Sequence, residues 1–219
     1  MYLFLVLIFC FNSVFAQVEE LSNGLLFPKF EKGIVVFKNG SRSATSLNYS
    51  TFEEEMLFQN ADSTIMVIAN PSDILVVIIG ERRFIPTSSK CIFYEEIQAG
   101  TGSFFVQHKA TMISDGKAAA YGGYSSTSAI TSFGSYSEGG SGRVVKLNPD
   151  VKYRIKYNYS FYVKSGKNYK RFMSAKSLGK LFKGQESKIE AFAKENSIDF
   201  SKIDDIASIV EYAYSMVNK

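Results

Sequence analysis

The sequence predicts a mainly β protein of the α+β class, in which an antiparallel sheet forms a sandwich or an open barrel and two to three helices follow. Three observations lead to this prediction. Short β-branched runs separated by turn residues fill most of the first two thirds of the chain. A long run at 151–163 alternates apolar with basic or polar residues. After residue 173 the apolar residues take up helical spacing.

The first sixteen residues, MYLFLVLIFCFNSVFA, combine an uncharged apolar run with the small residues Val14 and Ala16 near its end. This pattern is typical of a secretory signal peptide, and we expect the mature chain to begin at Gln17. The run is shorter than the roughly 20 apolar residues that cross a bilayer. We therefore expect no transmembrane helix in the mature chain and an extracytoplasmic location: periplasmic, attached to the outer membrane, or secreted.

The remaining chain divides into a β-rich domain at 17–165 and a helical C-terminal segment at 166–219. In the first of these, Asn39-Gly40 predicts a hairpin turn between two strands. The run Ile74–Ile79 is apolar throughout, which predicts a central strand buried on both faces. The strands expected before residue 111 are 33–37, 43–49, 55–59, 64–68, 74–79, 83–86, 91–97 and 103–110.

Residues 111–142 are rich in Gly and Ser with scattered aromatics, a composition that predicts a long loop. Loops of this length are uncommon and are usually functional or disordered. A binding loop and a tolerated insertion both remain open. Order is expected to return in the strand at 151–163, whose aromatic face should point into the core and whose basic face should point to solvent.

Three helices are expected after this strand. Ser174 caps a short one that stops at Gly184, and a second runs from Glu186 to Glu195. Ser201 caps the third, which carries acidic residues in its first turn, where the helix dipole favours negative charge.

The residue types argue against most catalytic chemistry. The chain has one histidine, His108, and two cysteines, of which Cys10 lies in the leader and Cys91 remains alone. We expect no internal disulfide, no metal site, no cofactor and no catalytic residue. His108 is expected to be a hydrogen-bonded, partly buried core residue. The acidic runs 53–55 and 95–96 should not form carboxylate pairs, because adjacent residues on a strand point to opposite faces.

Charge is divided unevenly along the chain. Residues 17–150 contain 11 Lys and Arg against 14 Asp and Glu, whereas residues 151–219 contain 14 against 7. Within 151–183 there are ten basic residues and no acidic one. This is either an ordinary solvated face or a site for an anionic partner such as lipopolysaccharide or a phospholipid headgroup; nucleic acid is not expected. The candidate anion-binding residues are Lys152, Arg154, Lys156 and Lys164.

Several stretches resemble a family of small exported proteins of Bacteroidota. They are KLF at 180–182, KENSIDF at 194–200 and the acidic-capped helix ending near Tyr214, together with LNYS at 47–50, EMLF at 55–58, ANP at 69–71, IGERRF at 79–84 and YGG at 121–123. The resemblance covers nearly all of the mature chain. It implies a β-rich body with a helical tail and an exported envelope protein, and it implies no catalytic residues.

The sequence therefore predicts an exported cell-envelope protein with a non-catalytic binding or structural role. Its partner would be an anionic envelope component or another envelope protein. Two alternatives stay open. One is a hydrolase of an envelope or extracellular polymer that uses two carboxylates, and the other is a small outer-membrane β-barrel.

Overall fold

The computed structural model describes residues 24–87, 92–118, 124–125 and 151–217, with the side chains at 114–118, 124–125 and 151–153 left aside. The predicted signal peptide, the start at Gln17 and Cys91 lie outside this description. So do residues 119–123 and 126–142 of the predicted loop.

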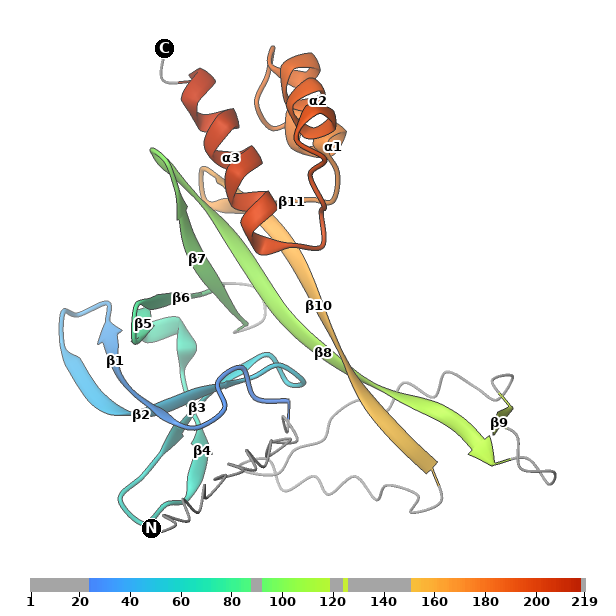
Figure 1. Ribbon diagram of the computed structural model, residues 1–219. Helices are drawn as coiled ribbons and strands as arrows, with labels where there is room; N and C mark the ends of the chain where they lie inside the picture. Colours follow the sequence, from blue (N-terminus) through green and yellow to red (C-terminus); the bar gives the residue numbers. More distant parts are fainter. Residues whose placement is uncertain (1–23, 88–91, 119–123, 126–150, 218–219) are drawn as a thin grey trace, which may run out of the picture.

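Figure 1 shows a strongly curved sheet followed by three helices. The strands are β1 (Glu31–Phe37), β2 (Arg42–Ser50), β3 (Glu55–Gln59), β4 (Ile65–Val67), β5 (Ile74–Ile79), β6 (Arg82–Pro86), β7 (Phe93–Ala99), β8 (Gly102–Ala118), β9 (Tyr124–Ser125), β10 (Val151–Ser165) and β11 (Asn168–Phe172). The helices are η1 (Pro71–Asp73), a single 3₁₀ turn, then α1 (Ala175–Gly179), α2 (Glu186–Glu195) and α3 (Ile203–Val217). None of the described helices is both long and apolar enough to cross a bilayer.

The described strands form one antiparallel sheet in the order β11-β10-β8-β7-β6-β5-β1-β2-β3-β4, with β9 paired to β8. The mainly β, α+β prediction is confirmed. The sheet is single and open, so the sandwich form of the prediction does not apply. Most neighbours in the sheet are also neighbours in sequence, as expected when short turns join antiparallel strands. The first turn contains the predicted Asn39-Gly40 pair, with Gly40 at φ 87°.

The sheet rolls up until strands far apart in its order touch. Tyr49 on β2 is fully buried, and its hydroxyl lies 3.4 Å from the carbonyl oxygens of Phe93 on β7 and His108 on β8. Just beyond β2, the carbonyl of Thr51 accepts a hydrogen bond from the amide of Ala110. The inside of this roll is one of two hydrophobic cores, which includes Val35, Leu47 and Phe84 besides Tyr49 and Phe93.

The second core lies between the helices and one face of β7, β8, β10 and β11. Phe104, Phe161 and Phe172 supply the sheet side of this core, and α1, α2 and α3 supply the rest. Ser174 caps α1 through a capping box with Ser177, as predicted. The sequence-based division placed β11 in the helical segment, but the turn at Gly166 (φ 61°) returns the chain into the sheet.

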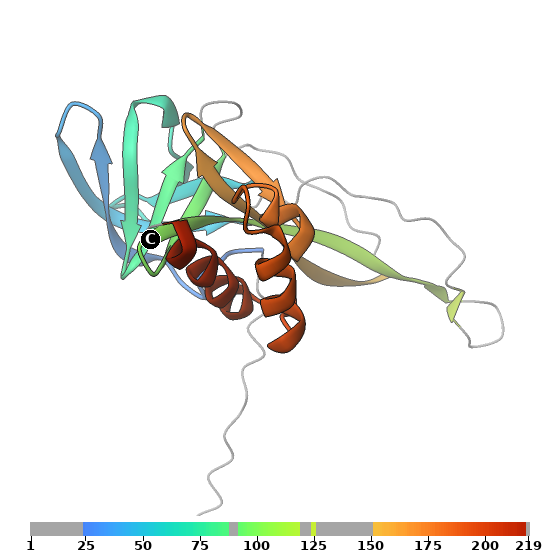
Figure 2. The same cartoon turned by 90° about the horizontal axis from the view of Figure 1, so that it is seen from above.

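Beyond Ala110, whose amide still bonds to Thr51, the paired strands β8 and β10 leave the body of the sheet as a two-stranded arm (Figure 2). β8 continues to Ala118, so the predicted loop was placed too early at residue 111. Residues 111–118, TMISDGKA, precede the Gly- and Ser-rich part of the predicted loop, and their pairing with β10 continues the strand.

Three smaller predictions are wrong. The helix capped by Ser174 ends at Gly179, not at Gly184. Leu75 in β5 is 54% exposed, so this strand is not buried on both faces. Ser201 does not cap α3: its hydroxyl donates to the carboxylate of Asp199, and the helix begins two residues later, at Ile203. The carboxylate of Asp205, in the first turn of α3, accepts a hydrogen bond from the backbone amide of Asp199.

Candidate functional site

The predicted basic residues lie on the face of β10 that points away from the helices. In a strand the residues at even spacing share a face, so Arg154, Lys156 and Lys164 lie on one side, opposite to the core residues Phe161 and Val163. All three basic side chains are exposed. The side chain of Lys152 lies outside the described part.

The structure separates these residues into two groups. Lys164 is eight residues from Lys156, which corresponds to about 26 Å along a strand. Next to Lys164, across the β10–β11 pairing, the exposed Arg171 lies opposite Tyr162 on the same face. We call Arg154, Lys156, Lys164 and Arg171 the basic face. Among the residues that the structure describes, Lys156, Lys164 and Arg171 have no ion-pair partner.

The expectation that the aromatic face of this strand points into the core holds for Phe161, which is 2% exposed, but not for Tyr157 and Tyr159. These two tyrosines are 39% and 40% exposed. The reason is that neither tyrosine belongs to the second core, whose residues on β10 are Phe161 and Val163. Tyr159 instead meets the ring of His108 edge-on.

Aromatic residues also occur on the basic face itself. Tyr162 stacks on Tyr94 with the ring centroids 4.6 Å apart, and Tyr169 meets Tyr94 and Phe105 edge-on. Burial, followed by the contact with Tyr162, raises the pKa of Tyr94. Aromatic rings therefore lie between the two groups of cations.

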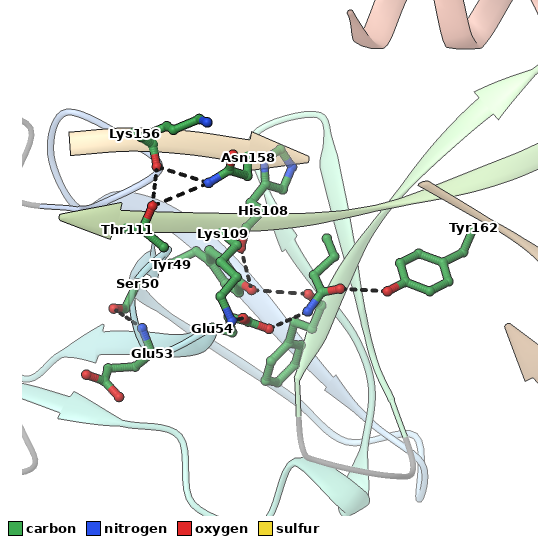
Figure 3. A network of polar contacts seen from close by, with 12 residues as sticks. Tyr49, Ser50, Glu53, Glu54, His108, Lys109, Thr111, Lys156, Asn158 and Tyr162 are labelled. Atoms are coloured by element: carbon green, nitrogen blue, oxygen red, sulfur yellow. Dashed lines mark hydrogen bonds and ion pairs between the residues drawn. The ribbon is translucent and has the colours of Figure 1, made fainter. Parts of the chain in front are cut away.

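A polar chain crosses the same face, as Figure 3 shows for its labelled members. The Tyr162 hydroxyl donates to the Gln107 side chain at 2.7 Å, and Gln107 in turn donates to the carboxylate of Glu54. The ammonium of Lys109 lies 2.7 Å from the other oxygen of Glu54. Glu54 is buried and has a left-handed backbone (φ 61°), a costly conformation for a residue other than glycine. The pairing neutralises Lys109, which for that reason is not part of the basic face.

The opposite face of β8 carries a second, buried polar group. His108 is 3% exposed, and its Nε2 lies 2.6 Å from the Glu95 carboxylate. Arg82 binds both oxygens of Glu95 at 2.6 and 2.8 Å. Burial alone would raise the pKa of Glu95, but the hydrogen bonds from His108 and Arg82 outweigh it and lower the pKa to about 2. The prediction of a buried, hydrogen-bonded histidine is confirmed.

The orientation of His108 limits what this group can do. A carboxylate can only accept, so Nε2 carries the proton toward Glu95. The other ring nitrogen, Nδ1, is buried without a hydrogen-bond partner in the described part of the chain. A carboxylate that orients an imidazole is the arrangement of a general base, but no described hydroxyl or thiol is held against Nδ1. The group instead ties β6, β7 and β8 together, and it places the Arg82 guanidinium 4.9 Å from the centre of the Phe27 ring.

The acidic run Glu53–Glu55 lies where the chain turns from β2 into β3, and only Glu55 belongs to a strand, so the strand alternation on which the prediction rested does not apply to Glu53 and Glu54. All three residues line one small cavity of about 220 Å³. Burial and the neighbouring Glu53 carboxylate raise the pKa of Glu55. No group of three or more His, Cys, Asp or Glu side chains in the described ranges is arranged to hold a metal ion.

No protein-family model, no curated protein and no solved structure matches this chain. The resemblance to exported proteins of Bacteroidota therefore stays a prediction.

Sequence reasoning identified the basic residues of β10 but missed the partners that other strands bring to them. The pairing of Glu54 with Lys109 and of Glu95 with His108 depends on which strands are neighbours and on how the sheet rolls. The alternation of Phe104, Val106 and His108 was the one available signal, since it placed His108 on the buried face.

Proposed function

We propose that the protein is an exported cell-envelope protein that binds an anionic component of the envelope through the basic face. The role is one of binding rather than catalysis. The observation that carries the proposal is the exposure of Arg154, Lys156, Lys164 and Arg171 on a sheet face that the helices leave uncovered.

The spacing of the cations suggests the kind of ligand. Arg154 and Lys156 are about 7 Å apart along the strand, and Lys164 lies about 26 Å further on. A single small anion cannot contact both groups, whereas a polyanionic glycan or a surface of phosphate headgroups can. Exposed charges at these distances attract such a partner strongly at low ionic strength and weakly at high salt.

The test is a sedimentation assay with the chain that starts at Gln17, using phosphatidylglycerol-containing vesicles, neutral phosphatidylcholine vesicles and purified lipopolysaccharide. We expect binding to the anionic samples that salt reverses. The double variant Lys156→Glu/Lys164→Glu should lose most of it. The control Lys188→Glu/Lys194→Glu makes the same change of charge at exposed positions of α2.

Two results would contradict the proposal. One is the absence of binding to every anionic sample, and the other is an equal loss in both double variants, which would indicate unspecific attraction. Fractionation of cells that express the full chain tests the location separately. Unprocessed protein in the cytosol would exclude export.

A second candidate function is a hydrolase that uses carboxylates. It is favoured by the gathering of Glu53, Glu54 and Glu55 around one cavity and by the raised pKa of Glu55, because a raised carboxyl pKa is a property of general acids. Release of reducing sugar from envelope polysaccharides that Glu55→Gln abolishes, and that Lys156→Glu/Lys164→Glu leaves unchanged, would support this function over the first.

A further inference from the structure

The rolled part of the sheet contains a cavity of about 950 Å³ that neither proposed function uses. It lies between β1, β2, β3 and β4, at the end of the roll where the chain turns through Asn39. Cavities of 300–1,000 Å³ in the mouth of a rolled sheet are the usual size and place of small-molecule sites. The large apolar lining residues are Val35, Phe37, Phe58, Met66, Val67 and Ile68.

The cavity exists because the inward side chains of β2 change in size along the strand. Leu47 and Tyr49 point inward and fill the core completely. Two and four residues before Leu47, the same face carries Thr45 and Ser43, and Ser43 lies opposite Val35 of β1. These two small side chains leave unfilled the space that large apolar residues occupy further along.

The apolar walls are only partly covered. Phe37, Phe58 and Ile68 pack against the core with part of their surface, and all three are half-buried. Met66 pairs with Phe58 and is also half-buried. Transfer of the remaining apolar surface from water to an apolar ligand is favourable.

Charge is confined to the outer edge of the cavity. Of its lining residues only Lys38 and Asp73 are charged, and both side chains are exposed. The amide of Lys38 donates to the carbonyl of Asp73 at 2.8 Å, which fixes the backbone there. In the described part of the chain the ammonium of Lys38 is in no ion pair, so it can meet an anionic group of a ligand.

We propose that this cavity binds the aliphatic chain of a fatty acid, with the chain against Phe58 and Met66 and the carboxylate next to Lys38. An unbranched chain suits this lining because it adapts to an irregular hollow, as the Met66 side chain does. Lys38 is the one cation among the lining residues, so the ligand's carboxylate should contact the Lys38 ammonium and point away from Asp73. This site is independent of the basic face.

The test is a fluorescence titration of the chain from Gln17 with cis-parinaric acid, followed by displacement with palmitate. We expect saturable binding at one site per chain. Met66→Asp should weaken it at least tenfold, because the carboxylate would lie in the apolar wall. Ile34→Asp is the matched control: Ile34 precedes Val35 in β1 but points to the other side of the sheet and is 40% exposed, so affinity should not change.

The role of Lys38 has its own readout. Lys38→Ala should weaken the binding of palmitate several-fold. It should leave the affinity for methyl palmitate unchanged, because the ester has no carboxylate. Circular dichroism and the melting temperature show whether each variant is folded. Should Met66→Asp fail to fold, Thr45→Phe fills the cavity instead and should also reduce binding.

Three outcomes would overturn the proposal. They are the absence of saturable binding, an equal effect of Met66→Asp and Ile34→Asp, and displacement of the probe by a sterol but not by palmitate. A change of oligomeric state in Met66→Asp, without a change in probe binding, would show instead that the cavity is a contact between copies of the chain.

Discussion

Glu95 and His108 face each other across β7 and β8 with 2.6 Å between the carboxylate and the imidazole Nε2, and both side chains are buried. Their partner Arg82 closes the group from β6. The three residues form a buried polar link between β6, β7 and β8. Removing one member of such a buried group strongly destabilises a protein, because it leaves a buried charge without its partner.

We predict that stability falls steeply in acid because of Glu95. Its pKa is lowered from the ordinary value of 4.5 to about 2 in the folded protein, so its stabilisation is complete above pH 4.5 and is lost as the pH falls toward 2. This shift of the Glu95 pKa contributes on the order of 3 kcal/mol to the free energy of unfolding at neutral pH. Urea unfolding of the wild type at pH 7 and pH 3 measures most of this loss, about 2 kcal/mol, because the carboxyl of the folded protein is still largely ionised at pH 3.

Glu95→Gln should lose stability at pH 7 and show much less difference between the two pH values. The control is Glu96→Gln at the next residue of β7. Glu96 forms an exposed ion pair with Arg83, with 3.1 Å between Oε2 of Glu96 and Nε of Arg83. Such pairs contribute about 0–1 kcal/mol. An acid transition that is the same in the wild type and in Glu95→Gln would disprove the assignment.

Glu55 should behave in the opposite way. Its pKa is raised by burial and by Glu53, so the folded state favours the protonated form and ionisation at neutral pH works against folding. Glu55→Gln is therefore expected to raise the melting temperature at pH 7, and this gain should shrink as the pH falls below the raised pKa. A lower melting temperature at pH 7 would contradict this prediction.

The close packing of α3 on the sheet should depend on Gly102. A Cβ atom at this position would lie 2.4 Å from the ring of Tyr214, whose hydroxyl donates to the carbonyl of Ser103 at 3.2 Å. We expect Gly102→Ala to cost about 1–3 kcal/mol of unfolding free energy, the usual range for overpacking.

A double-mutant cycle separates this contact from the backbone effect of alanine. In a Tyr214→Ala background the same Gly102→Ala change should cost clearly less, because the ring is gone. Equal costs in both backgrounds would mean that the contact with Tyr214 is not the cause.

The start of α1 offers a prediction of local stability. Ser174 accepts from the amide of Ser177, and the Ser177 hydroxyl lies within hydrogen-bond distance of the Ser174 amide. Ser174→Ala should destabilise the protein by about 1 kcal/mol in thermal or urea unfolding. Ser208→Ala, at an exposed position inside α3, is the control and should be neutral or slightly stabilising.

The local pattern of the sequence predicted most elements. β3, β5 and α2 have the predicted bounds, and Ser174 caps α1 as expected. These features depend on residues within one or two turns or strands of each other, where side-chain period, turn residues and caps act directly. The exposure of Arg154 and Lys156 could be predicted for the same reason, since alternation alone assigns them to a face.

The tertiary structure decided what the sequence by itself could not. Alternation implied that Tyr157 and Tyr159 would be buried, yet the described residues of the second core on β10 are Phe161 and Val163, and the two tyrosines are 39% and 40% exposed. The sheet has to roll up before Glu54 meets Lys109 or before Ser43 and Thr45 leave a cavity. Curvature and register arise from the packing of the whole sheet. They bring together residues that are far apart in the chain, and no local sequence pattern indicates these contacts.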